Sequence, residues 1–288
     1  MPNLKLTDGR FLEYFDNGIA STSAIIFHHG TPGHAVAWSQ WLEEAAARGV
    51  RAIAFSRAGY GVSDRNDGRT VFSNNDDIRE LLDSFGIIDF ISIGWSGGGP
   101  HAIATTLLNG SRGAITLAGV APYAVGGLDF LEGMGPENHE EFGAALEGER
   151  VVAEWLETNA ASYKNVTGNE LREALGGLIG DADKAVLAGD FAESNAASMR
   201  KAIAVSFDGW IDDDMAFIAP WGFDLSALTL PIHLWQGDQD FMVPHAHSYW
   251  LEKNIPTSHL RFIPGEGHLS LLVNHRNEIL NQAEGLLR

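Results

Sequence analysis

The stretch that decides the fold is Asp89-Phe90-Ile91-Ser92-Ile93-Gly94-Trp95-Ser96-Gly97-Gly98-Gly99-Pro100. Its first half is β-branched and aromatic, which is typical of a buried strand, and residues 101–108 after it carry apolar side chains at helical spacing. A strand therefore meets a helix at Ser96. Glycines on either side permit a sharp turn that exposes the serine hydroxyl at the end of the strand.

The helix that begins directly after Ser96 points its first N–H groups back towards the serine. Those groups can stabilise negative charge that develops on a substrate oxygen. A flexible turn or a phosphate-binding loop is the alternative interpretation, because the G-x-S-x-G pattern also arises by chance. The dinucleotide fingerprint needs G-x-G-x-x-G and a P-loop needs a Lys-Ser/Thr pair, and neither occurs in this stretch.

The composition sets the class of protein. A chain of 288 residues with 45% hydrophobic residues buries one large core, or one core and a subsidiary element. The absence of cysteine excludes disulfides, thiol catalysis and zinc–thiolate sites. Residues 1–6 lack the basic and then apolar profile of a secretory signal, so we expect a cytoplasmic protein.

The charge of the chain limits its partners. The 38 acidic residues outnumber the 19 basic ones, which gives a formal net charge of −19. This charge repels phosphate backbones and anionic lipid surfaces, and no apolar run approaches the roughly 20 residues that span a bilayer. We therefore expect a small-molecule substrate, no nucleic acid and no membrane partner. The sequence does not predict the oligomeric state.

Strand and helix patterns alternate along most of the chain, which predicts an α/β fold with a mostly parallel sheet and helices on both faces. An antiparallel edge strand is expected at residues 10–15. Buried strands are predicted at residues 24–27, 89–93 and 113–120, and further strands at 51–55, 230–235 and 259–263.

The alternation stops after the strand at 113–120, and about 100 residues follow without a convincing strand. Helical patterns occur within residues 141–205 of this segment, and a closing helix is predicted at residues 269–287. We therefore predict a core domain from residues 1–120 and 222–288, with a helical cap inserted at 121–221. The aromatic and methionine side chains of the insertion either line an apolar pocket or pack the cap against the core. They are Met134, Trp155, Met199, Trp210, Met215 and Trp221.

A serine hydroxyl needs an imidazole to take its proton and a carboxylate to orient that imidazole. Asp240 follows one predicted strand and His268 follows the next, so the chain order is serine, acid, histidine, as in nucleophile-elbow hydrolases. Asp238 and Asp129 are the alternative acids. The pair His245 and His247 has no further ligand nearby, so we expect no metal.

These motifs resemble the α/β-hydrolase superfamily over essentially the whole chain. His29-Gly30-Thr31-Pro32-Gly33 looks like its oxyanion loop, and Arg57-Ala58-Gly59-Tyr60-Gly61-Val62-Ser63 resembles its R-x-G-x-G-x-S segment. Gly237-x-x-Asp240-x-x-Val243-Pro244 and Gly267-His268 match its acid and histidine loops.

The resemblance implies a role for each residue. Ser96 is the nucleophile, His268 the base and Asp240 the orienting acid. The backbone N–H groups of Thr31 and Gly97 form the oxyanion hole. The inserted helices cover the site, and no cofactor takes part.

The nucleophile position narrows the chemistry. Superfamily members with aspartate there are dehalogenases or epoxide hydrolases, whereas Ser96 indicates acyl transfer. We predict a serine hydrolase that cleaves a small, largely apolar ester through an acyl-enzyme, and we rank peracid formation by the same triad below hydrolysis.

Two other functions stay open. The segment His29–Gly33 is similar to that of proline iminopeptidases, although their W-D-Q-R-G and G-G-S-W-G segments are replaced here. Residues 212–214, Asp-Asp-Asp, could then hold a substrate amine, but we expect an acidic triplet to be solvated or to cap a helix. The second alternative is a small-molecule sensor built on the same fold.

Overall fold

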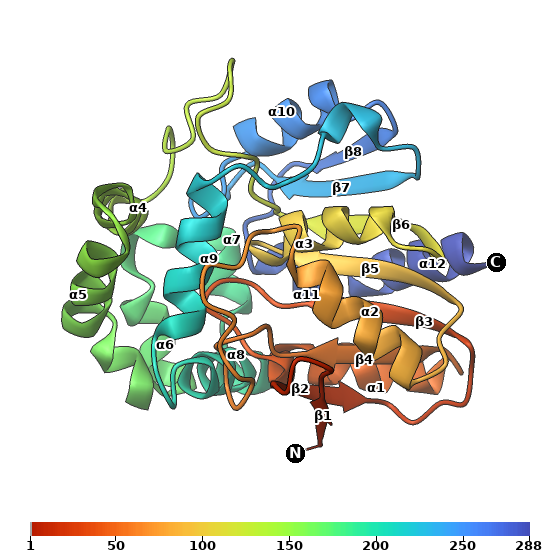
Figure 1. The fold of residues 1–288 in the computed structure, drawn as a ribbon. Coiled ribbons are helices and arrows are strands. Elements are labelled where there is room, and N and C mark those ends of the chain that lie inside the picture. Colours follow the sequence, from red (N-terminus) through yellow and green to blue (C-terminus); the bar gives the residue numbers. More distant parts are fainter. Residues whose placement is uncertain (1) are drawn as a thin grey trace.

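The computed structural model describes residues 2–288, and the eight strands in these residues form one central sheet (Figure 1). The strand order in these residues is β1-β2-β4-β3-β5-β6-β7-β8, with all pairs from β4 to β8 parallel and the pairs β1–β2 and β2–β4 antiparallel. The strands are β1 Asn3–Lys5, β2 Phe11–Asp16, β3 Ser23–His28, β4 Arg51–Phe55, β5 Asp89–Trp95, β6 Ser111–Leu117, β7 Ile232–Gly237 and β8 Ser258–Ile263. The predicted α/β fold with a mostly parallel sheet is confirmed.

One strand prediction needs correction. Strand β2 is antiparallel to its neighbours as expected, but it is not at the edge of the sheet, because β1 pairs with its outer side. The segment Asn3–Lys5 is only three residues long, which is too short for an alternating pattern to be recognised.

Helices flank the sheet on both sides. The α-helices of residues 2–288 are α1 Ser39–Ala47, α2 Asn74–Ser84, α3 Gly98–Ala104, α4 Pro136–Glu147, α5 Glu149–Asn159, α6 Gly168–Ala174, α7 Asp181–Val186, α8 Gly189–Ala202, α9 Asp208–Ile218, α10 Ala246–Asn254, α11 Ser270–Asn274 and α12 Arg276–Leu287. Short 3₁₀ helices lie at Ala35–Trp38, Thr105–Leu107, Ala161–Asn165, Gly176–Leu178 and Leu225–Ala227. None of the helices formed by residues 2–288 is long and apolar enough to cross a membrane.

The alternation of side chains along β3 explains the two helical layers. Ile25 points to the face covered by α1 and α12, where it joins the same buried cluster as Trp41 and Ile279. Ile26 points to the opposite face and shares a buried cluster with Ile78 of α2. A strand with both faces buried reads as a continuous apolar run, and this is the pattern that the sequence shows.

Between Leu117 and Ile232 the described chain forms helices α4 to α9 and their connections, and no sheet strand. These helices gather beyond one end of the strands, at the left of Figure 1. They lie where the insertion 121–221 was predicted, and the division of the chain into core and cap domains stays a prediction.

Two helical segments differ from the prediction. Helix α9 was not predicted, because its middle is the acidic triplet of residues 212–214. The predicted closing helix 269–287 is two helices, since the backbone at His275 departs from helical geometry between α11 and α12.

Candidate active site

The turn between β5 and α3 places Ser96 in the left-handed region, with a φ of 55°. A Cβ atom at Gly94 would collide with the carbonyl oxygen of Gly98, and one at Gly98 would collide with that of His28. The backbone N–H of Ser96 donates to the carbonyl oxygen of Leu117 over 2.9 Å. The predicted strand, turn and helix are therefore present, and sterics require both glycines.

The loops after β7 and β8 bring an acid and a histidine together. His268 Nδ1 lies 2.8 Å from Asp240 Oδ2, and both side chains are buried. The alternative acids lie elsewhere. Asp238 is exposed and accepts from the N–H of Gly265 over 2.7 Å, and the exposed Asp129 accepts from the N–H of Leu131 over 3.3 Å.

Hydrogen bonds fix the Asp240 carboxylate in place. Its Oδ1 accepts from the backbone N–H groups of Met242, over 2.9 Å, and Val243, over 2.8 Å. Its Oδ2 accepts from Gln236 Nε2 over 3.2 Å as well as facing His268. This carboxylate therefore has a single orientation from which to align the imidazole ring.

The surroundings of His268 make its imidazole ring more basic than a free histidine. Burial lowers the pKa of His268, but the charges of Asp240 and Asp183 and the hydrogen bond to Asp240 outweigh that effect. The pKa consequently lies above the ordinary value of 6.5. An imidazolium that forms here during a reaction is stabilised by the adjacent carboxylate.

A second buried carboxylate, which the sequence analysis missed, positions the His268 loop. Asp183 of α7 accepts from the backbone N–H groups of His268, Leu269 and Ser270, over 3.0, 2.8 and 2.9 Å respectively. A Cβ atom at Gly267 would lie 2.5 Å from Asp183 Oδ1, so glycine is needed there. The inserted helices thus hold the histidine loop at the start of α11, where free N–H groups need an acceptor.

The loop after β3 approaches the same turn. Thr31 and Gly97 both line the cavity described below, and a Cβ atom at Gly97 would collide with the side chain of Thr31. Neither backbone N–H donates to an acceptor within residues 2–288. Both groups are therefore without a partner among the described residues, and their role as an oxyanion hole stays a prediction.

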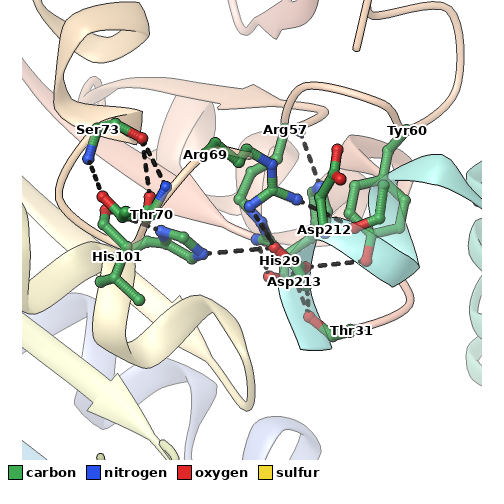
Figure 2. A network of polar contacts seen from close by, with 12 residues as sticks. His29, Thr31, Arg57, Tyr60, Arg69, Thr70, Ser73, His101, Asp212 and Asp213 are labelled. Atoms are coloured by element: carbon green, nitrogen blue, oxygen red, sulfur yellow. Dashed lines mark hydrogen bonds and ion pairs between the residues drawn. The ribbon is translucent and has the colours of Figure 1, made fainter. Parts of the chain in front are cut away.

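The side chain of Thr31 belongs to a buried polar network centred on Asp213 (Figure 2). Asp213 Oδ2 lies 2.6 Å from Arg57 Nη2, and it accepts from Thr31 Oγ1 over 2.5 Å and from Tyr60 OH over 2.8 Å. Its Oδ1 lies 2.6 Å from Arg69 Nη1. The network joins α9 of the insertion to the predicted oxyanion loop.

Arg57 completes this network on the side of the β3 loop. It donates to the carbonyl oxygens of His29 and, over 2.9 Å, Gly30. Burial alone would raise the pKa of Asp213, but Arg57 and Arg69 hold it well below its usual range. The carboxylate is ionised and compensated by two cations, which is the condition under which a protein tolerates a buried charge.

The expectation that the acidic triplet is solvated or caps a helix is wrong. All three residues are buried within α9. Asp212 Oδ1 pairs with Arg65 Nη2 over 2.7 Å, Asp213 pairs as described, and Asp214 faces the cavity. The arginine partners lie about 150 positions earlier in the chain, which is why the local pattern gave no sign of burial.

A cavity of about 370 Å³ opens over Ser96 and His268, and residues of the insertion form most of its wall. This volume is within the range of small-molecule sites. Four of the six aromatic and methionine residues expected at a pocket line it, namely Met134, Trp155, Met199 and Trp210. Trp221 and Met215 pack in apolar clusters instead.

Neither a metal nor a cofactor was expected at this site. Within residues 2–288, no three histidine, aspartate or glutamate side chains are grouped so that they could hold a metal ion. The residues of the site suit acyl transfer, because a serine, a paired imidazole and two free N–H groups border one cavity.

Comparison with known proteins defines the class. Residues 25–283 match the model of the alpha/beta hydrolase family, so the chain belongs to that family and is a hydrolase-fold enzyme. The solved structure of a thermophilic esterase from Thermogutta terrifontis is similar, with a TM-score of 0.72 and 20% identity over 100% of both chains.

Two relatives are more similar to this chain in sequence than that esterase is. A non-heme haloperoxidase from Rhodococcus erythropolis is 26% identical over 284 residues, which cover 95% of each chain. A non-heme chloroperoxidase from Streptomyces lividans is 28% identical over 155 residues, which span 52% of this chain and 56% of that protein. The likeness to proline iminopeptidases stays a prediction.

Asp213→Asn tests the buried network. It leaves Arg57 and Arg69 buried without a full counter-charge, so we expect the free energy of unfolding to fall by about 3–5 kcal/mol in urea denaturation. Asp67→Asn is the control, because Asp67 is 79% exposed and its loss costs within about 0.5 kcal/mol. Equal unfolding free energies for the two variants would show that the network contributes nothing to stability.

Proposed function

We propose that the protein is a serine hydrolase that cleaves a small ester through an acyl-enzyme intermediate on Ser96. The observation that carries this proposal is the pairing of His268 with the buried Asp240 beside the cavity that the strained Ser96 also lines. A neutral serine is a weak nucleophile, and this constellation supplies the base and the orienting carboxylate that it needs.

The chemistry proceeds in two halves. Ser96 Oγ attacks the ester carbonyl carbon while His268 Nε2 takes the hydroxyl proton, and the N–H groups of Thr31 and Gly97 stabilise the oxyanion. The tetrahedral intermediate expels the alcohol, which receives the proton from His268. A water molecule then attacks the acyl-enzyme and gives a proton to His268. The second tetrahedral intermediate releases the acid, and His268 returns the proton to Ser96 Oγ.

The cavity favours a compact substrate. Its volume of about 370 Å³ and its tryptophan, methionine and leucine side chains suit an acyl or alcohol group with a short apolar body rather than a long lipid chain. The net charge of −19 disfavours polyanionic substrates such as nucleotides.

Peracid formation is a second candidate, and the match to a haloperoxidase over 95% of both chains favours it. In that reaction hydrogen peroxide replaces water as the nucleophile that attacks the acyl-enzyme. Both candidates need the same acyl-enzyme. The aminopeptidase and sensor alternatives stay open, and repeated turnover of excess ester would distinguish an enzyme from a sensor.

Ser96→Ala removes the nucleophile from the turn and adds no bulk. We expect hydrolysis of p-nitrophenyl acetate to fall by about 10³-fold or more while the fold, measured by circular dichroism, is retained. Turnover close to that of the parent protein would contradict the assignment of Ser96.

Asp240→Asn and Asp238→Asn separate the two acids of one loop. Only neutral His268 accepts a proton, so kcat/KM should rise with pH through a pKa above 6.5 and fall off on the acid side. Asp240→Asn should lower kcat/KM by about 10³–10⁴-fold and move that acid limb to lower pH, because the group that raises the pKa is gone.

Asp238→Asn should leave kcat/KM within about threefold of the parent. The side chain of Asp238 is exposed, and its hydrogen bond is to the backbone of Gly265 and not to His268. Reversal of the two results would show that Asp238 is the orienting acid.

A further inference from the structure

One wall of the cavity is acidic and carries no compensating cation. Glu137, Glu140 and Glu141 of α4 line it together with Asp214 of α9. Among the described residues that line the cavity there is no lysine or arginine, and His268 is already paired with Asp240. This wall therefore presents net negative charge to whatever enters.

Asp214 is the residue that needs explanation. It is buried, and within residues 2–288 no N–H group and no hydroxyl group donates to either of its carboxylate oxygens. The hydrogen bond that it makes is with the carboxyl group of Glu141. The adjacent Asp213 is surrounded by Arg57, Arg69 and Tyr60. A buried carboxylate without donors costs several kcal/mol, and such groups in native proteins usually await a ligand, a proton or water.

The neighbour of Asp214 is the carboxyl group of Glu141, which accepts from Trp210 Nε1 over 2.6 Å. Burial raises the pKa of Asp214 well above its usual value, and the charges of Glu141 and Asp213 raise it further. Burial also raises the pKa of Glu141 to about 7, although the Trp210 hydrogen bond opposes this. Near neutral pH the two groups hold about one proton and one negative charge between them.

Aromatic rings surround this pair. Trp155, Tyr163 and Trp210 line the same cavity, and the face of an aromatic ring attracts a cation. The hydroxyl of Tyr163 is already bonded to the carbonyl oxygen of Ala174 over 2.8 Å, so this residue presents its ring rather than an available polar group. Carboxylates and aromatic faces together make a site suited to an organic ammonium group.

We propose that Glu141 and Asp214 bind an amino group of the substrate, so that the hydrolase prefers esters whose short apolar body ends in an ammonium group. This inference rests on the proposed function, because the bound amine belongs to a substrate only if the protein hydrolyses esters at Ser96. The N–H groups of the ammonium would satisfy the Asp214 oxygens, and its charge would compensate the pair. The apolar lining would hold the carbon chain between the amine and the ester.

The test is a binding measurement that does not depend on catalysis. Isothermal titration calorimetry compares 4-phenylbutylamine with 4-phenyl-1-butanol, which share an apolar body and differ in the charged group. At about pH 8, above the pKa of about 7 of Glu141, we expect the amine to bind at least about tenfold more tightly than the alcohol.

Glu141→Gln and Asp214→Asn should each reduce binding of the amine by about tenfold or more and leave that of the alcohol unchanged. Glu140→Gln is the matched control. It removes the same charge from the same cavity, but Glu140 is exposed and lies outside the pair, so the preference for the amine should persist.

Three results would overturn the proposal. In the first, the wild-type protein binds the amine no more tightly than the alcohol, an outcome that needs no variant to fold. In the second, the preference survives in both Glu141→Gln and Asp214→Asn. In the third, Glu141→Gln binds a quaternary analogue, 4-phenylbutyltrimethylammonium, as tightly as the wild-type protein does, which would assign recognition to the aromatic rings and not to the carboxyl pair.

Failure of the proposed function gives a different pattern. If Ser96→Ala hydrolyses esters as the parent does but the amine preference depends on Glu141 and Asp214, the subsite stands and the nucleophile assignment fails. If Ser96→Ala is inactive and the amine preference is absent, the hydrolase mechanism stands and the subsite fails.

Discussion

The buried ion pair between Arg57 and Asp213 is the interaction on which the site depends. Arg57 comes from the loop after β4 and Asp213 from α9 of the insertion, and a buried charge of either sign needs an opposite charge beside it. Because Asp213 also accepts from Thr31 and Arg57 donates to the carbonyl oxygen of Gly30, the pair fixes the β3 loop relative to the insertion. The geometry of the predicted oxyanion hole follows from this pairing.

Asp183 has the corresponding role for the loop that carries His268. Its three hydrogen bonds to the backbone at residues 268–270 hold the histidine loop from within the insertion. The helices between Leu117 and Ile232 therefore hold both loops that carry the proposed catalytic groups. The three acids of α9 show how environment sets function, since Asp212 and Asp213 are neutralised by arginines and Asp214 is left facing the cavity.

The sequence predicted those parts of the fold that local pattern determines. Buried strands such as β3 and β5 appear as apolar runs, and the turn at Ser96 follows from glycines whose Cβ atoms would collide with backbone. The pairing of Asp240 with His268 was predicted because both follow strands of one parallel sheet.

Features that depend on distant partners could not be predicted. Arg57 and Asp213 are 156 positions apart, and nothing near residues 212–214 indicated that arginines would bury them, so α9 was missed. The same reason applies to Asp183, whose partners lie 85 to 87 positions later, and to the pair of Glu141 and Asp214. Their unusual burial is visible only once the helices are packed.

The central claim is that Ser96 is the nucleophile within this cavity, and covalent trapping tests it most directly. The protein is treated with a small alkyl fluorophosphonate, digested, and analysed by mass spectrometry of the peptides. The account predicts a single phosphonylated peptide that contains Ser96, and no adduct in Asp240→Asn over the time that labels the parent completely. A protein that turns over esters while Ser96 stays unlabelled, or that carries the adduct on another residue, would contradict it.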